Sequence, residues 1–392
     1  MKNTYFFITG RNPALAVAEI EALLGENILK RDLGEGFYII ETSVGLDFSD
    51  LQKRLGGTIK IGEIIKKSEI DLEKEISEII LKKISDKKLN FGINEYGRKI
   101  NALAIKRMLK EKGKSVRLVT SKEKNLSSVI TKKEILDKDG VEINIFKTGN
   151  RTCIGETRVV QFFEEMSWRD WERPGKDELS GMLPPQLAKT MVNLTGPETS
   201  RTLLDPFCGS GTILTEAAII GFEKLIGSDI SQKAIDDTKK NFLWICDKKF
   251  ITKKIEPQLF NLDVRDLNKK IKKHSVDAIV TEPFLGPPLK KSAKPEEINK
   301  NKAELERLYR DAFLVFGDIL TKEGIIAIIF PVFVLKNKIF LDLLADIKKM
   351  GFKIKNPLKN VDYKFSETTE RGSVLYARPG QRVAREIFLF IR

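Results

Sequence analysis

The segment Thr202-Leu-Leu-Asp-Pro-Phe-Cys-Gly-Ser-Gly-Thr212 carries the strongest fold signal in this chain. A short apolar run ends at Asp205, a proline follows, and two glycines stand one residue apart at Gly209 and Gly211. Apolar residues then recur at helical spacing from Ile213 to Ile219. This order predicts a strand, a tight loop and a helix, which is the cofactor corner of an open α/β sheet.

The carboxylate of Asp205 indicates which cofactor the loop accepts. A loop built for pyrophosphate offers N–H groups and a helix N-terminus, and a carboxylate there would repel the anion. S-adenosylmethionine instead carries an ammonium and a sulfonium group, which attract a carboxylate. We therefore predict an S-adenosylmethionine site, and its predicted loop residues are Asp205, Pro206, Cys208, Gly209 and Gly211.

Two further strand ends complete the predicted cofactor site. Asp229, followed by Ile230, closes the next apolar strand, where a carboxylate holds the ribose diol of a nucleotide cofactor. The alternative for Asp229 is a strand-end residue that caps a turn. Asp263, followed by Val264, ends the strand after that and is predicted to accept a hydrogen bond from the adenine amino group, a role for which Asp266 competes.

The predicted reaction centre is the segment Thr281-Glu-Pro-Phe-Leu-Gly286, which follows the apolar strand 276–280. Ligands bind at the carboxyl edge of such a sheet. Methyl transfer to an exocyclic amine needs an acceptor that holds the N–H groups and directs the nitrogen lone pair, and in-line positioning supplies much of the remaining gain. The alternative is a proline-rich turn with a solvated Glu282. The predicted catalytic residues are Glu282, Pro283, Phe284 and Leu285.

Bulk composition restricts the remaining chemistry. The 392 residues carry a net charge of +14, three cysteines and a single histidine, His274. The cysteines lie far apart, which argues against a disulfide framework and a zinc site, and one histidine argues against His-dependent triads. We expect no metal, no membrane anchor and a cytoplasmic location, because no apolar stretch approaches membrane-spanning length.

Basic residues concentrate in residues 51–150, which makes this segment a candidate footprint on a polyanion. A helix is predicted over 99–112, and its polar face is either a phosphate-binding surface or a solvated one. The predicted RNA contacts on this face are Lys99, Lys106, Arg107, Lys110 and Lys114. Arg169 and Arg173, in a Trp- and Pro-rich segment further on, are predicted RNA contacts as well.

Alternating strand and helix patterns predict an α/β protein. From residue 201 onward five α/β repeats and a terminal pair of strands predict a doubly wound, Rossmann-like sheet whose last strand is antiparallel. The proline- and tryptophan-rich segment 156–200 is predicted to be an ordered connector rather than part of a core.

The motifs at 205–211, 228–230 and 281–286 together resemble the amino-methyltransferases of nucleic acids. Two further segments resemble the tRNA guanine-10 N2-methyltransferase family. One is Tyr-Phe-Phe-Ile-Thr-Gly-Arg-Asn-Pro-Ala-Leu-Ala-Val-Ala-Glu-Ile at 5–20. The other is the bridge with Arg169-Asp170, Arg173-Pro174, Gly181-Met-Leu-Pro-Pro-Gln-Leu-Ala-Lys189 and Asn193-Leu194.

The resemblance implies a division into an N-terminal α/β subdomain (1–50), a THUMP-like RNA-binding domain (51–155), an ordered linker (156–200) and a class I methyltransferase domain (201–392). It implies S-adenosylmethionine as cofactor, tRNA as partner and a guanine exocyclic amine (N2, position 10 type) as acceptor. It leaves open a small activator subunit, such as eukaryotic members of the family use.

The catalytic motif departs from the family pattern Asp-Pro-Pro-Tyr-Gly. Aligned on Gly286, Glu282 replaces the aspartate, Phe284 the second proline and Leu285 the tyrosine. A glutamate keeps the acceptor but reaches one methylene further, and Leu285 lacks a stacking face that Phe284 can supply. A shifted register would leave Thr281 in the position of the acid. Two alternatives therefore stay open: a tRNA-binding protein with a degenerate site, and a methyltransferase for a different RNA base amine.

Overall fold

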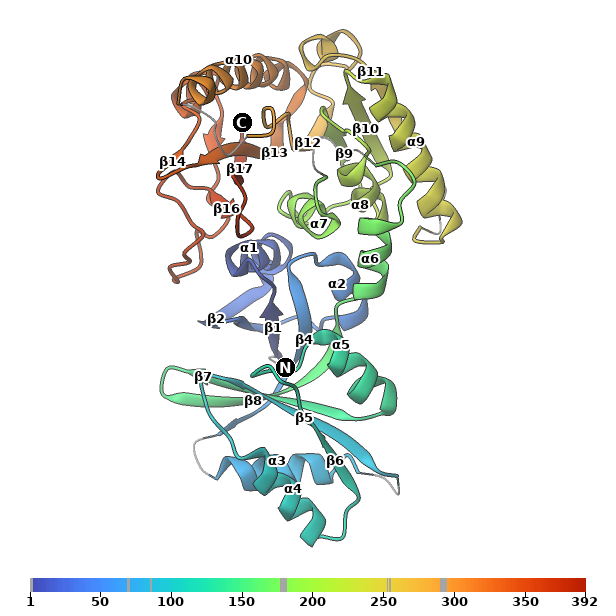
Figure 1. Cartoon of the computed structure of the whole chain (residues 1–392), viewed down its shortest axis with the longest axis vertical. Coiled ribbons are helices and arrows are strands. Elements are labelled where there is room, and N and C mark those ends of the chain that lie inside the picture. Colours follow the sequence, from blue (N-terminus) through green and yellow to red (C-terminus); the bar gives the residue numbers. More distant parts are fainter. Residues whose placement is uncertain are drawn as a thin grey trace. The chain divides into compact units, whose positions relative to one another are not determined.

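A computed structural model describes residues 3–68, 71–84, 87–176, 182–251, 253, 255–289 and 295–392 (Figure 1). The chain forms two compact units. Unit 1 comprises Met1–Val17 and Leu24–Glu165, and unit 2 comprises Ala18–Leu23 and Met166–Arg392. Among the described residues, no helix is long and apolar enough to cross a membrane.

Unit 1 is built on one eight-stranded sheet with the order β2-β3-β1-β4-β8-β7-β5-β6. Its strands are β1 (Asn3–Thr9), β2 (Ile28–Gly34), β3 (Phe37–Thr42), β4 (Thr58–Ser68), β5 (Leu89–Tyr96), β6 (Val116–Val119), β7 (Val141–Thr148) and β8 (Arg151–Val160). β4 pairs antiparallel with both β1 and β8. Phe6 and Phe37 also share a core cluster with Phe146. The boundary predicted at residue 50 therefore falls inside one sheet and one packed core.

The helices of unit 1 follow the expected capping chemistry. They are α1 (Pro13–Leu24), of which Ala18–Leu23 belongs to unit 2, α2 (Phe48–Arg54), α3 (Leu72–Leu81), α4 (Ala102–Glu111) and the short α5 (Ser128–Ile130). The Asn101 side chain accepts a hydrogen bond from the Ala104 N–H at 3.0 Å and so caps α4. Gly113, with φ of +72°, follows the end of this helix. Ile105 and Leu109 are buried, so α4 packs its apolar face on the sheet as the helical spacing predicts.

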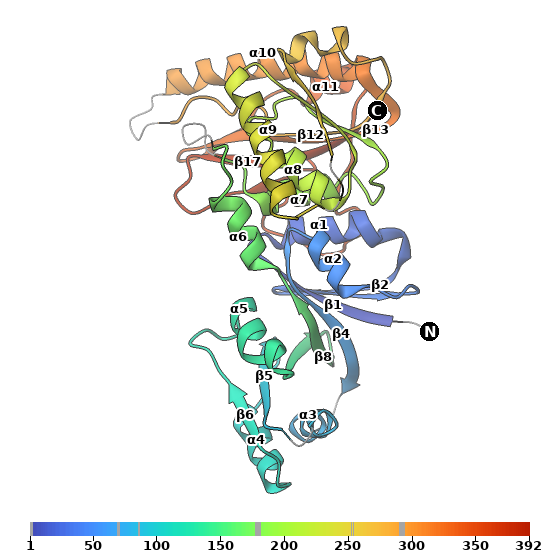
Figure 2. The same cartoon turned by 90° about the vertical axis from the view of Figure 1, so that its right-hand side faces the viewer.

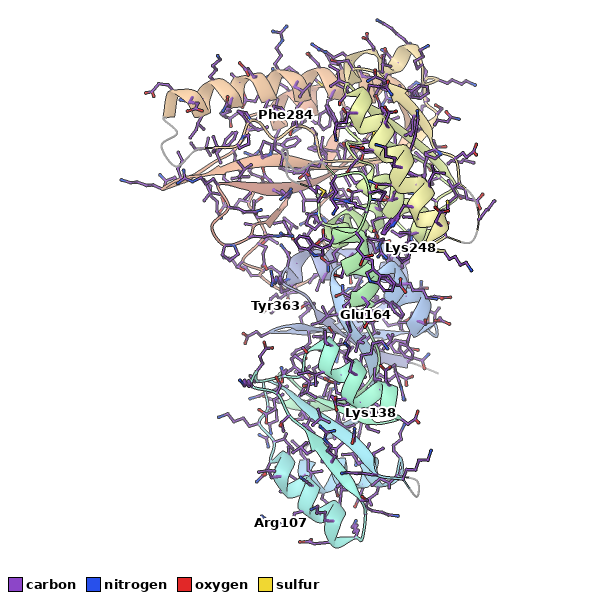
Figure 3. All side chains as sticks on the ribbon, turned by 45° about the vertical axis from the view of Figure 1, so that its right-hand side comes forward. Arg107, Lys138, Glu164, Lys248, Phe284 and Tyr363 are labelled. Carbon is purple, nitrogen blue, oxygen red and sulfur yellow. The ribbon has the colours of Figure 1, made fainter. Side chains whose placement is uncertain are left out.

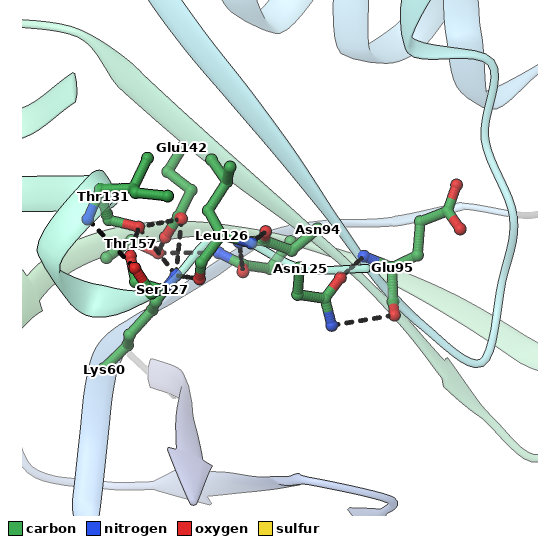
Figure 4. A network of polar contacts seen from close by, with 11 residues as sticks. Lys60, Asn94, Glu95, Asn125, Leu126, Ser127, Thr131, Glu142 and Thr157 are labelled. Atoms are coloured by element: carbon green, nitrogen blue, oxygen red, sulfur yellow. Dashed lines mark hydrogen bonds and ion pairs between the residues drawn. The ribbon is translucent and has the colours of Figure 1, made fainter. Parts of the chain in front are cut away.

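A buried ion pair ties the irregular segment after β6 to the sheet of unit 1 (Figure 4). Lys60 Nζ donates to Glu142 Oε1 at 2.7 Å, to the Leu126 carbonyl at 2.7 Å and to Thr131 Oγ1 at 2.9 Å. Thr157 Oγ1 donates to the other Glu142 oxygen at 2.5 Å. Both charged side chains are at most 1% exposed. All three donors of the ammonium are thus used, which is the condition for a buried charge to be tolerated.

Replacing Lys60 with Met is expected to destabilise unit 1 by about 3–5 kcal/mol, because the Glu142 carboxylate would stay buried without its cation. Lys138→Met is the matched control, since Lys138 pairs with Glu134 at the surface and such pairs are worth about 0–1 kcal/mol. Amide hydrogen exchange of β4 and β7 in the full-length chain measures both. Equal protection in the two variants would contradict a structural role for the buried pair.

Unit 2 contains a second, mixed sheet with the main order β11-β10-β9-β12-β13-β17-β15, which is parallel from β11 to β13 and antiparallel beyond β13. In addition, β14 pairs with β13 and β16 with β17. Its strands are β9 (Thr202–Asp205), β10 (Lys224–Asp229), β11 (Gln258–Asn261), β12 (Val276–Thr281), β13 (Leu320–Val334), β14 (Lys338–Ile339), β15 (Lys353–Ile354), β16 (Val374–Tyr376) and β17 (Val383–Ile391). β17 runs antiparallel to β13. The Rossmann-like sheet with an antiparallel last strand is therefore confirmed.

Helices cover both faces of this sheet. They are α6 (Phe163–Trp171), α7 (Pro185–Asn193), α8 (Thr212–Ile220), α9 (Gln232–Asp247), α10 (Pro295–Ile319) and α11 (Leu344–Lys349). Figure 2 shows α10 and α11 on one side of the sheet and α7 and α8 on the other. β12 and β13 are buried along most of their length, which is typical of strands covered on both faces.

The composition of the segment 156–200 predicts a connector, but the segment also contains a buried helix. Leu187, Met191 and Val192 of α7 are buried, and this helix packs against α8. Pro184 and Pro185 mark the start of α7, because proline is favoured at the first helical position, where its missing N–H costs nothing. Gly181, which contributed to the predicted bridge, lies outside the described residues.

Candidate functional site

The loop after β9 has the tight geometry that its sequence predicts. Gly211 N–H donates to the Cys208 carbonyl at 2.7 Å, and Cys208 N–H donates to the Ser228 carbonyl at 2.9 Å. Gly209 and Gly211 both have positive φ, at +51° and +80°. A Cβ on Gly211 would lie 2.7 Å from Thr238 Cγ2, whereas a Cβ on Gly209 would meet nothing within 4 Å. Open space therefore lies beside Gly209, where a ligand can approach the backbone.

Helix α9 fixes this loop through two polar side chains that the sequence interpretation missed. Thr238 Oγ1 donates to the Gly209 carbonyl at 2.8 Å, and Asn241 Nδ2 donates to the Ser210 carbonyl at 2.8 Å. Asn241 also bonds both the N–H and the carbonyl of Gly175. The signal in the sequence is that Thr238 and Asn241 fall on the same helical face as the apolar Ile235, Phe242 and Ile245. Polar residues buried on such a face need hydrogen-bond partners.

We expect Gly211→Ala to weaken S-adenosylmethionine binding far more than Gly209→Ala does. Both substitutions place a side chain at positive φ, which costs roughly 1–3 kcal/mol. Only the Gly211 variant also pushes its Cβ into Thr238. Calorimetric titration of the two variants with the cofactor makes the comparison. Equal affinities would contradict a role for the close approach between the loop and α9.

Carboxylates converge at the carboxyl edge of the sheet. Asp205 is 1% exposed, and its Oδ1 accepts hydrogen bonds from Thr281 Oγ1 at 2.7 Å and from Phe207 N–H at 3.2 Å. Burial raises the pKa of Asp205 to about 7, and the negative charges of Asp229 and Glu282 add to the rise. A neighbouring cation would reverse this effect, so the cluster is suited to a positively charged ligand.

Asp229 lies beside the glycine loop at the end of β10. Its Oδ2 accepts from Gly209 N–H at 2.9 Å, and its Oδ1 accepts from Ser231 N–H at 2.9 Å. Ile230, the next residue, is 73% exposed although it is large and apolar. A carboxylate oxygen can accept more than one hydrogen bond, so Asp229 keeps acceptor capacity for a diol.

The third predicted cofactor position differs from the expectation. Both Asp263 oxygens accept from the Arg265 guanidinium, at 2.9 and 2.7 Å, and this ion pair lowers the pKa of Asp263. Val264 is 3% exposed and belongs to the hydrophobic core, so its side chain is not available to a ligand. The competing Asp266 pairs with Lys269 at 2.6 Å. The Val264 side chain packs inward, and the cofactor role of Asp263 and Val264 stays a prediction.

The segment after β12 places Glu282 opposite an arginine. Arg385 Nε donates to Glu282 Oε1 at 2.5 Å and its Nη2 to Oε2 at 3.4 Å. Pro283 is buried, Leu285 is half-buried, and Phe284 is 55% exposed (Figure 3). The backbone of this segment is held from α10, since the buried Tyr309 donates its O–H to the Phe284 carbonyl at 3.0 Å.

Arg385 was not identified from the sequence, although the apolar strand 383–391 contains the charged pair Arg385-Glu386. Successive side chains of a strand point to opposite faces. Glu386 accepts from Ser373 Oγ at 2.7 Å and pairs with Arg371, whereas Arg385 reaches Glu282. Two adjacent charges inside a buried strand are thus the signal that could have indicated this contact.

The predicted RNA contacts fall into two groups. Lys99, Arg107, Lys110 and Lys114 are exposed on or beside α4 in unit 1, with Lys106 partly exposed; Arg107 is labelled in Figure 3. Arg169 and Arg173 are instead 4% exposed within unit 2. Arg169 Nε donates to Glu216 at 2.6 Å, and Arg173 Nη1 to Thr212 Oγ1 at 2.5 Å. Their assignment as RNA contacts is wrong, because both brace α8 from inside the unit.

Comparisons with known proteins agree with this site. The model of the RMKL-like methyltransferase domain family matches residues 173–356. The tRNA (guanine(10)-N2)-dimethyltransferase of Methanocaldococcus jannaschii is 32% identical over 229 residues, which cover 57% of this chain and 58% of that protein. The crystal structure of TrmN from Thermus thermophilus has a TM-score of 0.53 and 15% identity over 99% of both chains, which shows the same fold.

A further relative matches over most of its own length. The probable tRNA (guanine(10)-N2)-dimethyltransferase of Methanothermococcus thermolithotrophicus is 35% identical over 133 residues, which are 34% of this chain and 78% of that protein. The chain spans only part of the length of the first curated relatives. It covers 58% of the Methanocaldococcus protein and 28% of the one from Methanothermobacter thermautotrophicus. From these identities, and from the methyltransferase-domain match over the cofactor loop and the reaction centre, the chain belongs to the tRNA (guanine(10)-N2)-dimethyltransferase family.

Proposed function

We propose that this protein transfers a methyl group from S-adenosylmethionine to the exocyclic N2 of a guanine in tRNA. The observation that carries the proposal is the convergence of Asp205, Asp229 and Glu282 at the carboxyl edge of a methyltransferase-type sheet. Membership of the family supports tRNA as substrate, and the names of the relatives favour N2 of guanine 10. Two successive transfers to the same nitrogen are consistent with those names.

The described residues fit S-adenosylmethionine. Asp205 and the open space beside Gly209 are suited to the cationic methionine end, and Asp229 to the ribose hydroxyls. The exposed Ile230 offers an apolar surface to the adenine ring. Among the described residues, no three His, Cys, Asp or Glu side chains are placed to hold a metal ion.

When bound, the cofactor supplies a methyl carbon attached to a positively charged sulfur. Glu282 would accept an N–H of the guanine N2 amino group and so direct the nitrogen lone pair toward that carbon. Asp205 and Asp229 would hold this cofactor, which would supply its methyl group to N2 and leave as S-adenosylhomocysteine. The surplus proton of N2 passes to the Glu282 carboxylate and then to water. The exposed Phe284, two residues after Glu282, would stack on the flipped base.

We propose that unit 1 is the THUMP-like part that binds tRNA and that its α4 face contacts phosphates. Exposed basic side chains on and beside α4 support this, as does the net charge of +14. A cytoplasmic location, where tRNA is modified, stays a prediction, and so does the need for an activator subunit.

Replacing Arg107 and Lys110 by Gln is expected to weaken tRNA binding and to flatten its salt dependence. Removing one cation from a phosphate lowers the slope of log K against log salt by about 0.7–0.9. Lys138→Gln is the control, because the Lys138 charge is paired with Glu134. Filter binding between 50 and about 200 mM salt measures the slopes. An unchanged slope in the double variant would remove α4 from the RNA-binding surface.

The transferase proposal is tested by radiolabelled methyl transfer to total unmodified tRNA, together with calorimetric titration of the cofactor. Transfer that requires both tRNA and Glu282 is the expected result. Cofactor binding without transfer to any RNA would instead favour a tRNA-binding protein with a degenerate site. Transfer to an adenine or cytosine amine would favour the different-base alternative.

A further inference from the structure

The ion pair between Glu282 and Arg385 lies where the proposed target base must bind. Arg385 is held by the sheet on both sides, since it stands opposite Pro331 of β13 and Tyr376 of β16. The side chains of Arg385 and Glu282 are 9% and 13% exposed, so neither is fully closed off from a ligand. A side chain on a paired strand is positioned more precisely than one on a loop.

The pair retains unused hydrogen-bonding capacity on both partners. Each Glu282 oxygen accepts one bond from Arg385 and has a further lone pair available. A guanidinium has five N–H donors, and two of its nitrogens, Nε and Nη2, face Glu282. Within the described part of the chain, the third nitrogen, Nη1, donates no hydrogen bond. The pair thus presents acceptors next to a cationic donor.

This arrangement is complementary to one nucleobase edge. The Watson–Crick edge of guanine carries the N2 amino group and N1–H as donors, followed by O6 as an acceptor. Adenine has an unprotonated N1 and no carbonyl oxygen, and cytosine has an unprotonated N3 beside its amine. Each of these would place a ring acceptor against a Glu282 oxygen, and a buried acceptor facing an acceptor is strongly disfavoured.

We infer that Arg385 is a specificity-determining residue that donates a hydrogen bond to O6 of the target guanine while it orients Glu282 toward N1–H and N2. The inference rests on the proposed guanine N2 transfer. It also accounts for the glutamate in place of the aspartate of the resembled motif. The extra methylene brings the carboxylate to Arg385, so that acceptor and donor stand side by side on one base edge.

The test is a chemical cycle that changes O6 and Arg385 separately. Single-turnover methyl transfer is measured on tRNA that carries either guanosine or 6-thioguanosine at the modified position. Sulfur is a poor acceptor, whereas N1–H and N2 are retained. The enzymes are the wild type, Arg385→Met and Arg385→Lys, each checked for folding and cofactor affinity. Effects of the larger sulfur atom that do not involve Arg385 cancel in the cycle.

The wild type is expected to react about 10- to 100-fold more slowly on the thio substrate, as loss of a hydrogen bond to a charged group predicts. Arg385→Met should be slow on guanosine and nearly insensitive to the sulfur. The thio factor is the ratio of the rate on guanosine to the rate on 6-thioguanosine. For Arg385→Lys we expect a thio factor between those of the wild type and Arg385→Met, because a single ammonium cannot bind Glu282 and O6 in the same bidentate manner. If Arg385→Met does not fold, the test is whether the thio factor of Arg385→Lys is smaller than that of the wild type.

Equal thio factors in the wild type and the variants would overturn the role of Arg385 but leave the proposed transferase function intact. No transfer to guanosine by the wild type would overturn the proposed function and this inference together. The two failures are therefore distinguishable from the wild-type rate alone.

Discussion

Glu282→Gln is expected to lower the single-turnover rate of methyl transfer roughly 10²–10³-fold, with cofactor affinity almost unchanged. Glutamine keeps the volume of the side chain and one acceptor for Arg385, but it has no charge to receive the N2 proton or to stabilise the cationic nitrogen of the transition state. Rapid-quench measurement with labelled cofactor and saturating tRNA gives the rate directly.

Two further variants accompany this measurement. Glu304→Gln removes an exposed carboxylate on α10 and should leave the rate unchanged. Glu282→Asp restores the residue of the resembled motif but shortens the reach toward Arg385, so we expect it to be slower than the wild type. Equal methyl incorporation by Glu282→Gln and the wild type would remove Glu282 from the mechanism.

Asp205→Asn is expected to weaken S-adenosylmethionine binding by about 10-fold or more, since the buried site no longer offers a negative charge to the cationic cofactor. The change keeps the shape of the side chain, and the Asn oxygen can still accept from Thr281 and Phe207. Calorimetric titration measures the affinity. S-adenosylhomocysteine, which lacks the sulfonium charge, should be affected less than S-adenosylmethionine.

The same residue predicts a pH dependence with a definite sign. The pKa of Asp205 is raised from 3.8 to about 7, so the neutral carboxylic acid predominates below that pH in the free protein. A cationic ligand needs the ionised form, and the dissociation constant should therefore fall as pH rises from about 6 to about 8. In the free protein the contribution of Asp205 to stability has the opposite sign: it decreases as pH rises from about 4 toward 7, because burial favours the protonated group. A flat binding profile would contradict the assignment of Asp205.

The sequence predicts those elements of the fold that depend on the spacing of neighbouring residues. β9, the glycine loop and α8 follow from Asp205, Gly209 and Gly211 and the helical spacing after them, and β10 ends at Asp229 as expected. β4 was not predicted as a strand. β4 contains Gly62 and three lysines, and it becomes a strand because both of its edges pair in a sheet whose other strands are distant in sequence.

The parts of the site that were missed depend on contacts between distant segments. Glu282 and Arg385 lie 103 positions apart and meet only because β17 inserts beside β13. The prolines before α7 were interpreted as loop signals, although they begin a buried helix. The positive charge of Arg169 and Arg173 favours an RNA contact, whereas both side chains donate to residues of α8.

Guanine N2 methylation is tested most directly by mass spectrometry of tRNA that has been incubated with this protein and S-adenosylmethionine, digested to nucleosides and mapped to the modified fragment. We predict N2-methylguanosine or N2,N2-dimethylguanosine at one guanine of unmodified tRNA, and its absence with Glu282→Gln. A methyl group on another base, on ribose or on a ring nitrogen of guanine would contradict guanine N2 transfer, as would an unmodified tRNA at saturating cofactor.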